Sequence, residues 1–316
     1  MPKIKNPHHG SLAYWPRRRA KREYARVHSW AKVKEPKLLG FAGYKVGMTH
    51  AIISDNRAYS QTKGEDVFCP VTVLECPPLK IASINFYKKT PYGSKLSSAV
   101  FSDKLDKELE RKMIMPKKIK KRADDITLSA YTQPKLTGIK KKPELFEIAI
   151  GGSKEEKLNY AKDKLGKEIE IKDVFQEGQQ LDTHAITKGK GFQGPVRRFG
   201  IGLRAHKSEK ARRNPGSLGS WNAQQHIMWR VAHAAKTGYS TRTEYNKLLL
   251  KIVKPEETNP KSGFMHYGVV KNQCVFLKGS VAGPAKRLIR FNYSTRPNKG
   301  LPKEAPSIKY VNLKTK

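Results

Sequence analysis

The chain has 316 residues, of which 64 are Lys or Arg and 27 are Asp or Glu, so its formal net charge is +37. Positive charge in such excess repels itself and favours polyanionic partners. Apolar residues make up only 37% of the sequence, yet 13 Tyr, 11 Phe and 4 Trp are too many aromatic residues for a simple disordered tail. We therefore expect a folded core with basic extensions, in one large or two modest domains.

Several classes of protein are excluded by the sequence. Charged residues interrupt every apolar run before it reaches the roughly 18 residues of a membrane span. The N-terminus is basic but lacks the apolar segment of a signal peptide, so we expect a protein retained in the cytoplasm. The cysteines at 69, 76 and 274 lack the spacing of a zinc site, which favours a reducing compartment and no bound metal. Cys69 and Cys76 are expected to be small buried residues.

Residues 1–37 are predicted to form an extended basic arm. They contain eleven Lys or Arg against two Glu and show no amphipathic period. Aromatic residues are interleaved with the basic ones: Tyr14, Trp15, Tyr24 and Trp30. Basic groups neutralise phosphates and aromatic rings stack on unpaired bases, so the mixture favours RNA over a solvated disordered tail, which is the alternative. The candidate contacts in the arm are Arg17, Arg18 and Arg19.

From residue 38 the pattern changes to short β-type runs bounded by Gly and Pro. We predict antiparallel strands at 39–53, 68–76, 80–89, 144–150, 168–174, 181–187, 246–253, 268–278 and 285–292. Their number favours a closed or nearly closed β-barrel, which leaves few exposed edges. The barrel would comprise 38–89, 167–187 and 246–316, the last range ending in a C-terminal tail.

A first insertion, over 90–166, is predicted to be helical and charged. Residues 102–122 place Leu105, Leu109 and Met113 at four-residue spacing after Ser102, a candidate N-cap. A second helix is predicted at 153–165, between Ser153 as cap and a glycine that ends it. Both are expected to pack one apolar stripe on the core.

A second insertion, over 188–245, is predicted to be a basic, glycine-rich finger. Residues 187–213 contain nine Lys or Arg, five Gly and one Glu. This segment has too few apolar groups for their burial to offset the conformational entropy that is lost when the segment becomes ordered. A partner must therefore supply the contacts that order it. Glycines let the backbone approach a phosphate chain closely, and Phe192 and Phe199 can anchor or stack.

The finger also contains Trp221, which Pro-Gly and Gly-Ser turns would present at a loop tip. The alternative is a tryptophan packed back on the barrel. His226 and His233, with Trp229 and Arg230, could share one face of a short helix, for RNA contacts or core packing. No nucleophilic or acid–base set surrounds them.

One motif in the finger matches a dinucleotide-binding motif but lacks the sequence that such a site requires. The glycines at 189, 191 and 194 match G-x-G-x-x-G, but Pro195 and two arginines follow where a dinucleotide site needs an apolar helix. We therefore expect no cofactor.

Five motifs together carry a resemblance to a known family. They are HGSLAYWPRRRAK (9–21), GFAGYKVGMTHAI (40–52), THAITKGKGFQGPVRRFG (183–200), GSW-x4-HIMWRVAHAAKTGYSTRTEYN (219–246) and KGSVAGPAKRLIRF (278–291). In this order, and spanning nearly the whole chain, they resemble the universal large-subunit ribosomal protein of family three in its archaeal form.

The resemblance implies a mainly β fold, with a six-stranded translation-factor-type β-barrel core, an α-helical insertion, an extended N-terminal arm and a long central basic finger loop that reaches toward the peptidyl transferase centre. Trp221 is similar to the family's fingertip tryptophan, and no function is carried onto His206. The candidate RNA-binding residues are Arg17, Arg18, Arg19, Lys188, Lys190, Phe192, Arg197, Arg198, Arg204, Arg212, Arg213, Trp221, His226, Trp229, Arg230 and Arg242.

The function expected on this basis is structural. The chain would bind and help fold large-subunit, 23S-type rRNA beside neighbouring ribosomal proteins in the cytoplasm, without catalysis, membrane contact or a small-molecule substrate. Two alternatives remain: a generic polyanion or nucleic-acid-binding protein, and a subunit of an RNA-modifying enzyme, which would need a second, cofactor-binding domain.

Overall fold

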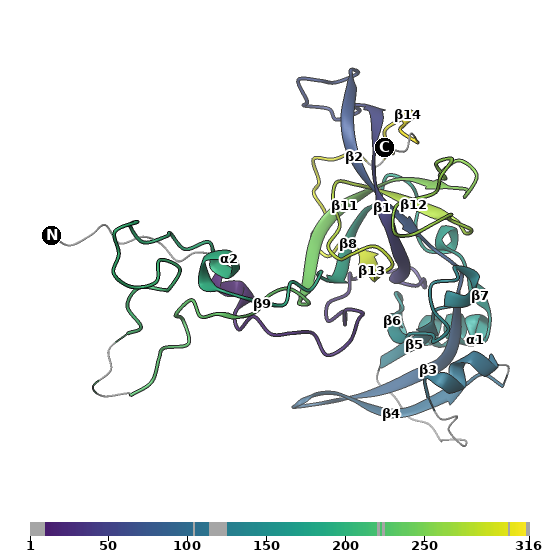
Figure 1. Cartoon of the computed structure of the whole chain (residues 1–316). Helices are drawn as coiled ribbons and strands as arrows, with labels where there is room; N and C mark the ends of the chain where they lie inside the picture. Colours follow the sequence, from purple (N-terminus) through teal and green to yellow (C-terminus); the bar gives the residue numbers. More distant parts are fainter. Residues whose placement is uncertain are drawn as a thin grey trace. The chain divides into compact units, whose positions relative to one another are not determined.

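The computed structural model describes residues 10–103, 105–113, 125–219, 222, 225–302 and 304–313. The chain divides into two compact units. Unit 1 comprises Met1–Arg22 and Ile186–Thr241, and unit 2 comprises Glu23–Ala185 and Arg242–Lys316. The fold is mainly β, as predicted, and its strand pairs are antiparallel in the described part of the chain (Figure 1).

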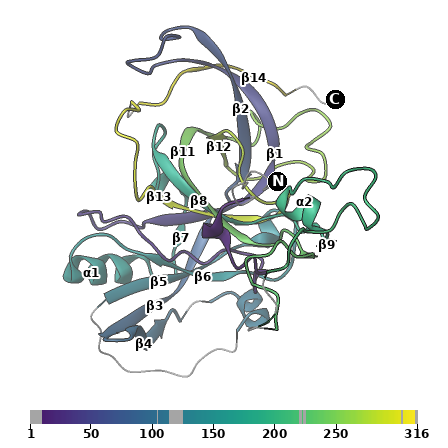
Figure 2. The ribbon, with the colours of Figure 1, turned by 90° about the vertical axis from the view of Figure 1, so that its left-hand side faces the viewer.

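The larger sheet has seven strands. They are β1 (Gly40–Ser54), β2 (Asp66–Glu75), β8 (Gln180–Ile186), β11 (Thr241–Val253), β12 (Cys274–Lys278), β13 (Leu288–Tyr293) and β14 (Ile308–Val311). Their order is β13-β8-β11-β12-β2-β1-β14, and β13 also pairs with β1. The pairings of six strands therefore return to their starting point, and Figure 2 shows the strong curvature of β1 and β2.

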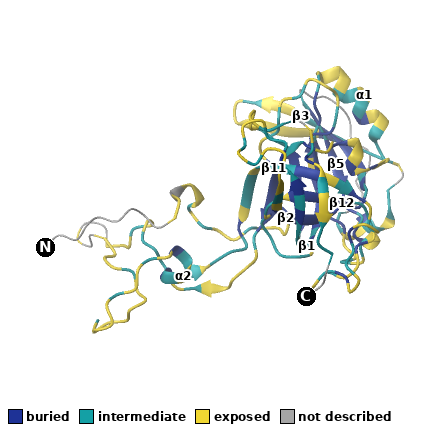
Figure 3. Cartoon of the chain, turned by 90° about the horizontal axis from the view of Figure 1, so that it is seen from above, coloured by how far each residue is buried: buried dark blue, intermediate teal, exposed yellow. Residues whose placement is uncertain are grey.

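The smaller sheet lies in the segment between β2 and β8. Its strands are β3 (Leu79–Thr90), β4 (Gly93–Phe101), β5 (Asp125–Tyr131), β6 (Leu145–Ala149) and β7 (Glu168–Ile169), in the order β4-β3-β5-β6 with β7 on β3. Ile81, Leu128 and Phe146 of this sheet belong to the same buried cluster as Phe41 and Phe291 of the larger one. The two sheets thus share one hydrophobic core, and Figure 3 shows buried residues concentrated in their strands.

Helical structure is sparse. The α-helices of the described residues are α1 (Lys154–Lys164) and α2 (Pro195–Phe199), and the 3-10 turns are η1 (Leu12–Tyr14), η2 (Lys107–Arg111), η3 (Pro134–Leu136) and η4 (Ile171–Asp173). The prediction of α1 is confirmed. The backbone N–H of Ser153 donates to Glu156 Oε2 over 2.9 Å at its start, and Gly166 follows its end at φ +74°.

The helix predicted over 102–122 was wrong in its described part, which contains only η2. Residues 114–122 lie outside the described residues. Asp106, and not Ser102, precedes the turn. The predicted apolar stripe is nevertheless real, because Leu109 is fully buried and Leu105 and Met113 pack beside it. A single turn is enough to bury one leucine among so many charges.

The range 90–166 contains β4, β5 and β6 as well as α1, so it is richer in strand than the sequence indicated. Predicted strands at 168–174 and 268–278 are shorter in the structure, where only β7 and β12 pair. The strand β4 was not predicted from the sequence, because it is polar, rich in serine and exposed along most of its length.

A buried carboxylate fixes the loop that precedes β12. Glu75 is fully buried, and its Oε1 accepts hydrogen bonds from the backbone N–H groups of Lys271 and Asn272 at 3.0 and 2.9 Å. The hydroxyl of Tyr267 donates to Oε2, and burial followed by the Glu75 charge raises the pKa of Tyr267 far above its usual range. Because both carboxylate oxygens of Glu75 accept hydrogen bonds, the free-energy cost of burying this charge is offset.

The prediction that Cys69 and Cys76 are buried is confirmed. The thiols at 69, 76 and 274 are free and buried. Burial raises the pKa of each, so they are small apolar residues of the core.

Candidate nucleic-acid interface

Unit 1 contains a concentrated positive charge. Its 78 residues hold eighteen Lys or Arg, seven in Met1–Arg22 and eleven in Ile186–Thr241, and Glu209 is its one acidic residue. Unit 1 therefore supplies +17 of the chain's net charge of +37. The repulsion between so many positive charges must be relieved, either by an anionic partner or by solvent around an exposed loop.

A narrow two-stranded stalk forms the base of unit 1. β9 (Phe192–Gln193) pairs with β10 (Ala235–Lys236). The pairing is extended by the N–H of Lys190, which donates to Thr237 O over 2.9 Å, and by the N–H of Thr187, which donates to Ser240 O over 3.0 Å. Gly238 has φ +74°, and a Cβ there would lie 2.1 Å from the Lys188 carbonyl oxygen. Only glycine allows this close approach of the two backbones.

The N-terminal arm runs along this stalk within unit 1. The N–H of Ala20 donates to Tyr239 O over 2.7 Å, and the hydroxyl of Ser240 donates to Arg18 O over 3.1 Å. The guanidinium Nη1 of Arg17 donates to Arg198 O over 2.8 Å. Segments 181 to 222 residues apart in the sequence thus form one basic element.

An aromatic cluster holds arm and finger together. Trp15 of the arm stacks on Phe199, with ring centroids 5.0 Å apart, and meets Trp229 edge to face at 5.8 Å. The guanidinium of Arg17 lies 4.2 Å from the Phe199 centroid and that of Arg198 lies 4.8 Å from it. Two cations thus share one aromatic ring, an arrangement that is favourable where the guanidinium groups are partly desolvated.

Arg198 helps to hold the arm and the finger together. Its Nη1 donates to His233 O over 2.8 Å, and burial lowers the pKa of the guanidinium. Its neighbour Arg197 is exposed. Adjacent arginines in α2 therefore have different surroundings, because successive helical residues point about 100° apart.

The Trp15 contacts lead to a testable prediction. Trp15→Ala removes the ring that packs on both Phe199 and Trp229, so the arm is expected to detach, and trypsin is expected to cut after Arg17, Arg18 and Arg19 about tenfold faster. Cleavage of the full-length chain, followed by mass spectrometry, measures this rate. Phe192→Ala is the matched control, because Phe192 is an aromatic residue of the same unit that is 71% exposed. Equal cleavage rates for Trp15→Ala and the unmodified chain would contradict the assignment.

The segment that follows α2 is a closed loop. The N–H of Arg204 donates to Arg212 O over 3.1 Å, and its Nη2 donates to Pro215 O over 2.8 Å. Lys207, Lys210 and Arg213 are exposed. The loop therefore presents its cations outward while Arg204 closes its base.

The sequence-predicted residues fall into three groups. Exposed in the structure are Arg18, Arg19, Lys188, Lys190, Phe192, Arg197, Arg212, Arg213, His226, Trp229 and Arg230. Half-buried are Arg17, Arg198, Arg204 and Arg242, the last on β11 in unit 2. Trp221 lies outside the described residues. The short helix considered for 226–233 was wrong, because 225–233 contains turns and bends only.

Sequence reasoning missed the role of Trp15. The sequence shows Trp15 only as one of several aromatic residues in the arm. Its partner Phe199 lies 184 positions later, so no local pattern connects the two residues. The local signal that could have found it is the Tyr-Trp-Pro sequence before three arginines, which is too apolar for a purely electrostatic tail.

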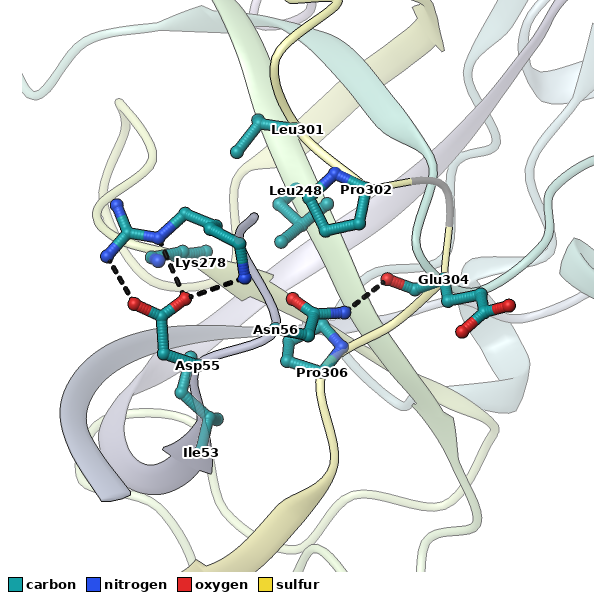
Figure 4. A pocket seen from close by; sticks show the side chains of 10 residues that line it. Ile53, Asp55, Asn56, Leu248, Lys278, Leu301, Pro302, Glu304 and Pro306 are labelled. Carbon is teal, nitrogen blue, oxygen red and sulfur yellow. Dashed lines mark hydrogen bonds and ion pairs between the residues drawn. The ribbon is translucent and has the colours of Figure 1, made fainter. Parts of the chain in front are cut away.

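A pocket in unit 2 is lined by both polar and apolar side chains. The pocket in Figure 4 holds Asp55 and Arg57, whose side chains pair over 2.7 and 2.9 Å, and the amide of Asn56, which donates to Glu304 O over 3.0 Å. The hydrogen bonds of Arg57 hold the pKa of Asp55 well below its usual range. Asp55 and Arg57 thus balance each other's charge. No cluster of three metal-ligating side chains occurs among the described residues. Nor does any helix there have the length and apolar character needed to cross a bilayer.

Comparison with known proteins places the whole chain beside one family. The profile of the family described as ribosomal protein L3 matches residues 1–118 and 114–316. The chain is 46% identical over 329 residues to the large ribosomal subunit protein uL3 of Methanobrevibacter smithii, covering 98% of this chain and 97% of that protein. It is 47% identical over 312 residues to uL3 of Archaeoglobus fulgidus, covering 94% of each, and 45% identical over 331 residues to uL3 of Methanocaldococcus jannaschii, covering 99% and 98%.

Proposed function

Because the chain belongs to the ribosomal protein L3 family, we propose that unit 1 is the element that threads between rRNA segments, with its finger directed toward the peptidyl transferase centre. The chain is a structural constituent of the large ribosomal subunit and not an enzyme. Its partners are large-subunit rRNA and neighbouring ribosomal proteins, in the cytoplasm.

The observation that carries the proposal is the joining of arm and finger in unit 1. This unit has eighteen cations, one carboxylate and a small aromatic cluster in place of a core. RNA supplies the missing counter-charge, and neutralisation of phosphates releases bound cations from RNA, which favours binding. Arginine forks can bridge phosphates of two RNA strands, lowering the repulsion between them.

We divide the cations of unit 1 by task. Exposed side chains such as Lys188, Lys190 and Arg197 contact phosphates, while Arg17 and Arg198 fix the shape that presents them. The exposed rings of Phe192 and Trp229, 71% and 62% accessible, are available to stack on unpaired bases. The proposed contact set also includes Arg18, Arg19, Arg204, Arg212, Arg213, Trp221, His226, Arg230 and Arg242.

The domain organisation follows from the same proposal. The six strands whose pairings return from β13 to β1 would be the translation-factor-type barrel, and β3 to β7 with α1 would be the insertion between its strands. Residues 1–37 would be the arm and 188–245 the finger. The boundaries of unit 1 at Ile186 and Thr241 support the bounds of the finger, whereas residues 23–37 of the proposed arm belong to unit 2.

The fingertip assignment of Trp221 is tested by Trp221→Ala in ribosomes that contain only the variant chain. Loss of one aromatic at a loop tip leaves unit 2 folded, so we expect normal incorporation into large subunits but altered aminoacyl-tRNA binding and altered sensitivity to peptidyl transferase inhibitors. Filter binding of tRNA and growth in graded drug concentrations measure these effects. Tyr59→Ala serves as the control, because it removes an exposed aromatic ring of unit 2 that has no place in the proposed contact set. Unchanged tRNA and drug responses would refute the assignment.

The alternatives lose their support. The match to one ribosomal protein family over nearly the whole chain favours the structural role over a generic polyanion binder and over a subunit of an RNA-modifying enzyme.

A further inference from the structure

The hairpin of β3 and β4 extends beyond the rest of its sheet. The pairing of β3 with β5 ends at Tyr87, whereas its pairing with β4 continues to Thr90 and Gly93. Residues 91–97 are all exposed, as are Lys88 and Lys89. The pairing of β3 with β5 therefore stops short of this hairpin tip, residues 88–96.

The charges of the hairpin tip are arranged unfavourably for a free surface. Lys88 and Lys95 stand directly opposite each other across the two strands. Residues 86–101 contain no Asp or Glu, and neither lysine has a carboxylate within ion-pair distance in the described chain. Opposed like charges destabilise an antiparallel pair. An anion between them would remove that penalty.

The turn also presents an aromatic ring. Tyr92 is fully exposed, at 101%, and Gly93 beside it has φ +116°, a backbone conformation that only glycine adopts readily. The Pro-Tyr-Gly turn thus holds the tyrosine outward, where it contributes nothing to the core. An exposed ring beside two cations is the combination that binds single-stranded RNA, by stacking and phosphate contact.

We propose that the hairpin tip is a second RNA-binding element, separate from unit 1, in which Lys88 and Lys95 flank a phosphate and Tyr92 stacks on an unpaired base. The proposal rests on the proposed function, because it takes rRNA as the partner. RNA fits better than an apolar protein surface because the tip has cations and no apolar stripe apart from Tyr92 and the half-exposed Leu96.

The test uses the full chain and an in vitro transcript of large-subunit rRNA, with affinity measured over a range of salt concentrations. Lys88→Gln with Lys95→Gln is expected to reduce the slope of log K against log salt by about 0.7 for one shared phosphate, and by up to about 1.4 for two. Tyr92→Ala is expected to weaken binding at least about fivefold with an unchanged slope. The charge-matched control is Lys141→Gln with Lys142→Gln, two exposed lysines of unit 2.

A second measurement separates binding from folding. Lys95→Glu replaces the opposed like charges by an opposite pair, so it is expected to raise the thermal unfolding midpoint of the free chain while it weakens RNA binding. Loss of binding in a more stable protein cannot come from misfolding.

The outcomes are distinct. Equal losses in the hairpin and control pairs would mean a general electrostatic effect and would overturn the site. Unchanged RNA affinity would also overturn it, and loss of a neighbouring protein from purified subunits would then assign the tip to a protein partner. Failure of the unmodified chain to bind the transcript would instead count against the proposed function itself.

Discussion

Neutralising four exposed cations of unit 1 is expected to lower the affinity of the chain for large-subunit rRNA about 10³-fold at 0.1 M salt. The variant is Lys188→Gln, Lys190→Gln, Arg197→Gln and Arg213→Gln, chosen because all four side chains are exposed. Each phosphate contact contributes about 0.7 to 0.9 to the slope of log K against log salt, so four lost contacts remove close to three orders of magnitude. Titration of an rRNA transcript at several salt concentrations measures both quantities.

The control has the same change of charge in unit 2: Lys141→Gln, Lys154→Gln, Lys162→Gln and Lys172→Gln, all exposed. If affinity depended on net charge alone, both variants would lose the same affinity. That result would remove unit 1 from its assigned role.

Arg290→Ala is expected to lower the free energy of unfolding by about 3 to 5 kcal/mol. Arg290 is 4% exposed, yet burial lowers its pKa only to about 10, so it is a buried cation at neutral pH. Its Nη1 donates to Ala25 O over 3.2 Å and its Nη2 donates to Glu147 O. The guanidinium also lies 4.6 Å from the ring centroid of Phe146. Removal leaves two carbonyls without this donor and a cavity between β13, β6 and the segment around Ala25.

Urea unfolding of the full-length chain measures this effect. Arg290→Lys keeps the charge but cannot reach both carbonyls with a planar fork, so an intermediate loss is expected. Lys251→Ala removes an exposed cation of β11 and should change stability by less than about 0.5 kcal/mol. If Arg290→Ala lowered the free energy of unfolding no more than Lys251→Ala does, the hydrogen bonds of Arg290 would not be important for the stability of unit 2.

The sequence was most informative where one periodicity governed a segment. Strands β1, β2, β3, β8 and β13 were predicted within a few residues, because alternating or continuous Val, Ile and Phe bounded by Gly indicate buried strands. α1 was predicted from its serine and glycine boundaries. β4 was missed because its exposed serines carry no hydrophobic pattern, and 102–113 was overpredicted because three apolar residues at helical spacing can be buried by one 3-10 turn.

The interface was predictable in composition but not in arrangement. Glycines and arginines indicated a finger, and they indicated RNA. That Arg198 supports the fold while Arg197 faces outward depends on Trp15, Phe199 and His233, which only the folded chain brings together. Long-range pairs of this kind leave no periodic signal.

Crosslinking with mass spectrometry on large subunits isolated by sedimentation tests the central claim most directly. The chain should migrate with the large subunit, and Lys190, Arg204 and Trp221 should crosslink to rRNA nucleotides near the peptidyl transferase centre. A chain that migrates apart from the large subunit, or that crosslinks to rRNA only through unit 2, would contradict the assignment of unit 1 as its principal rRNA-binding element.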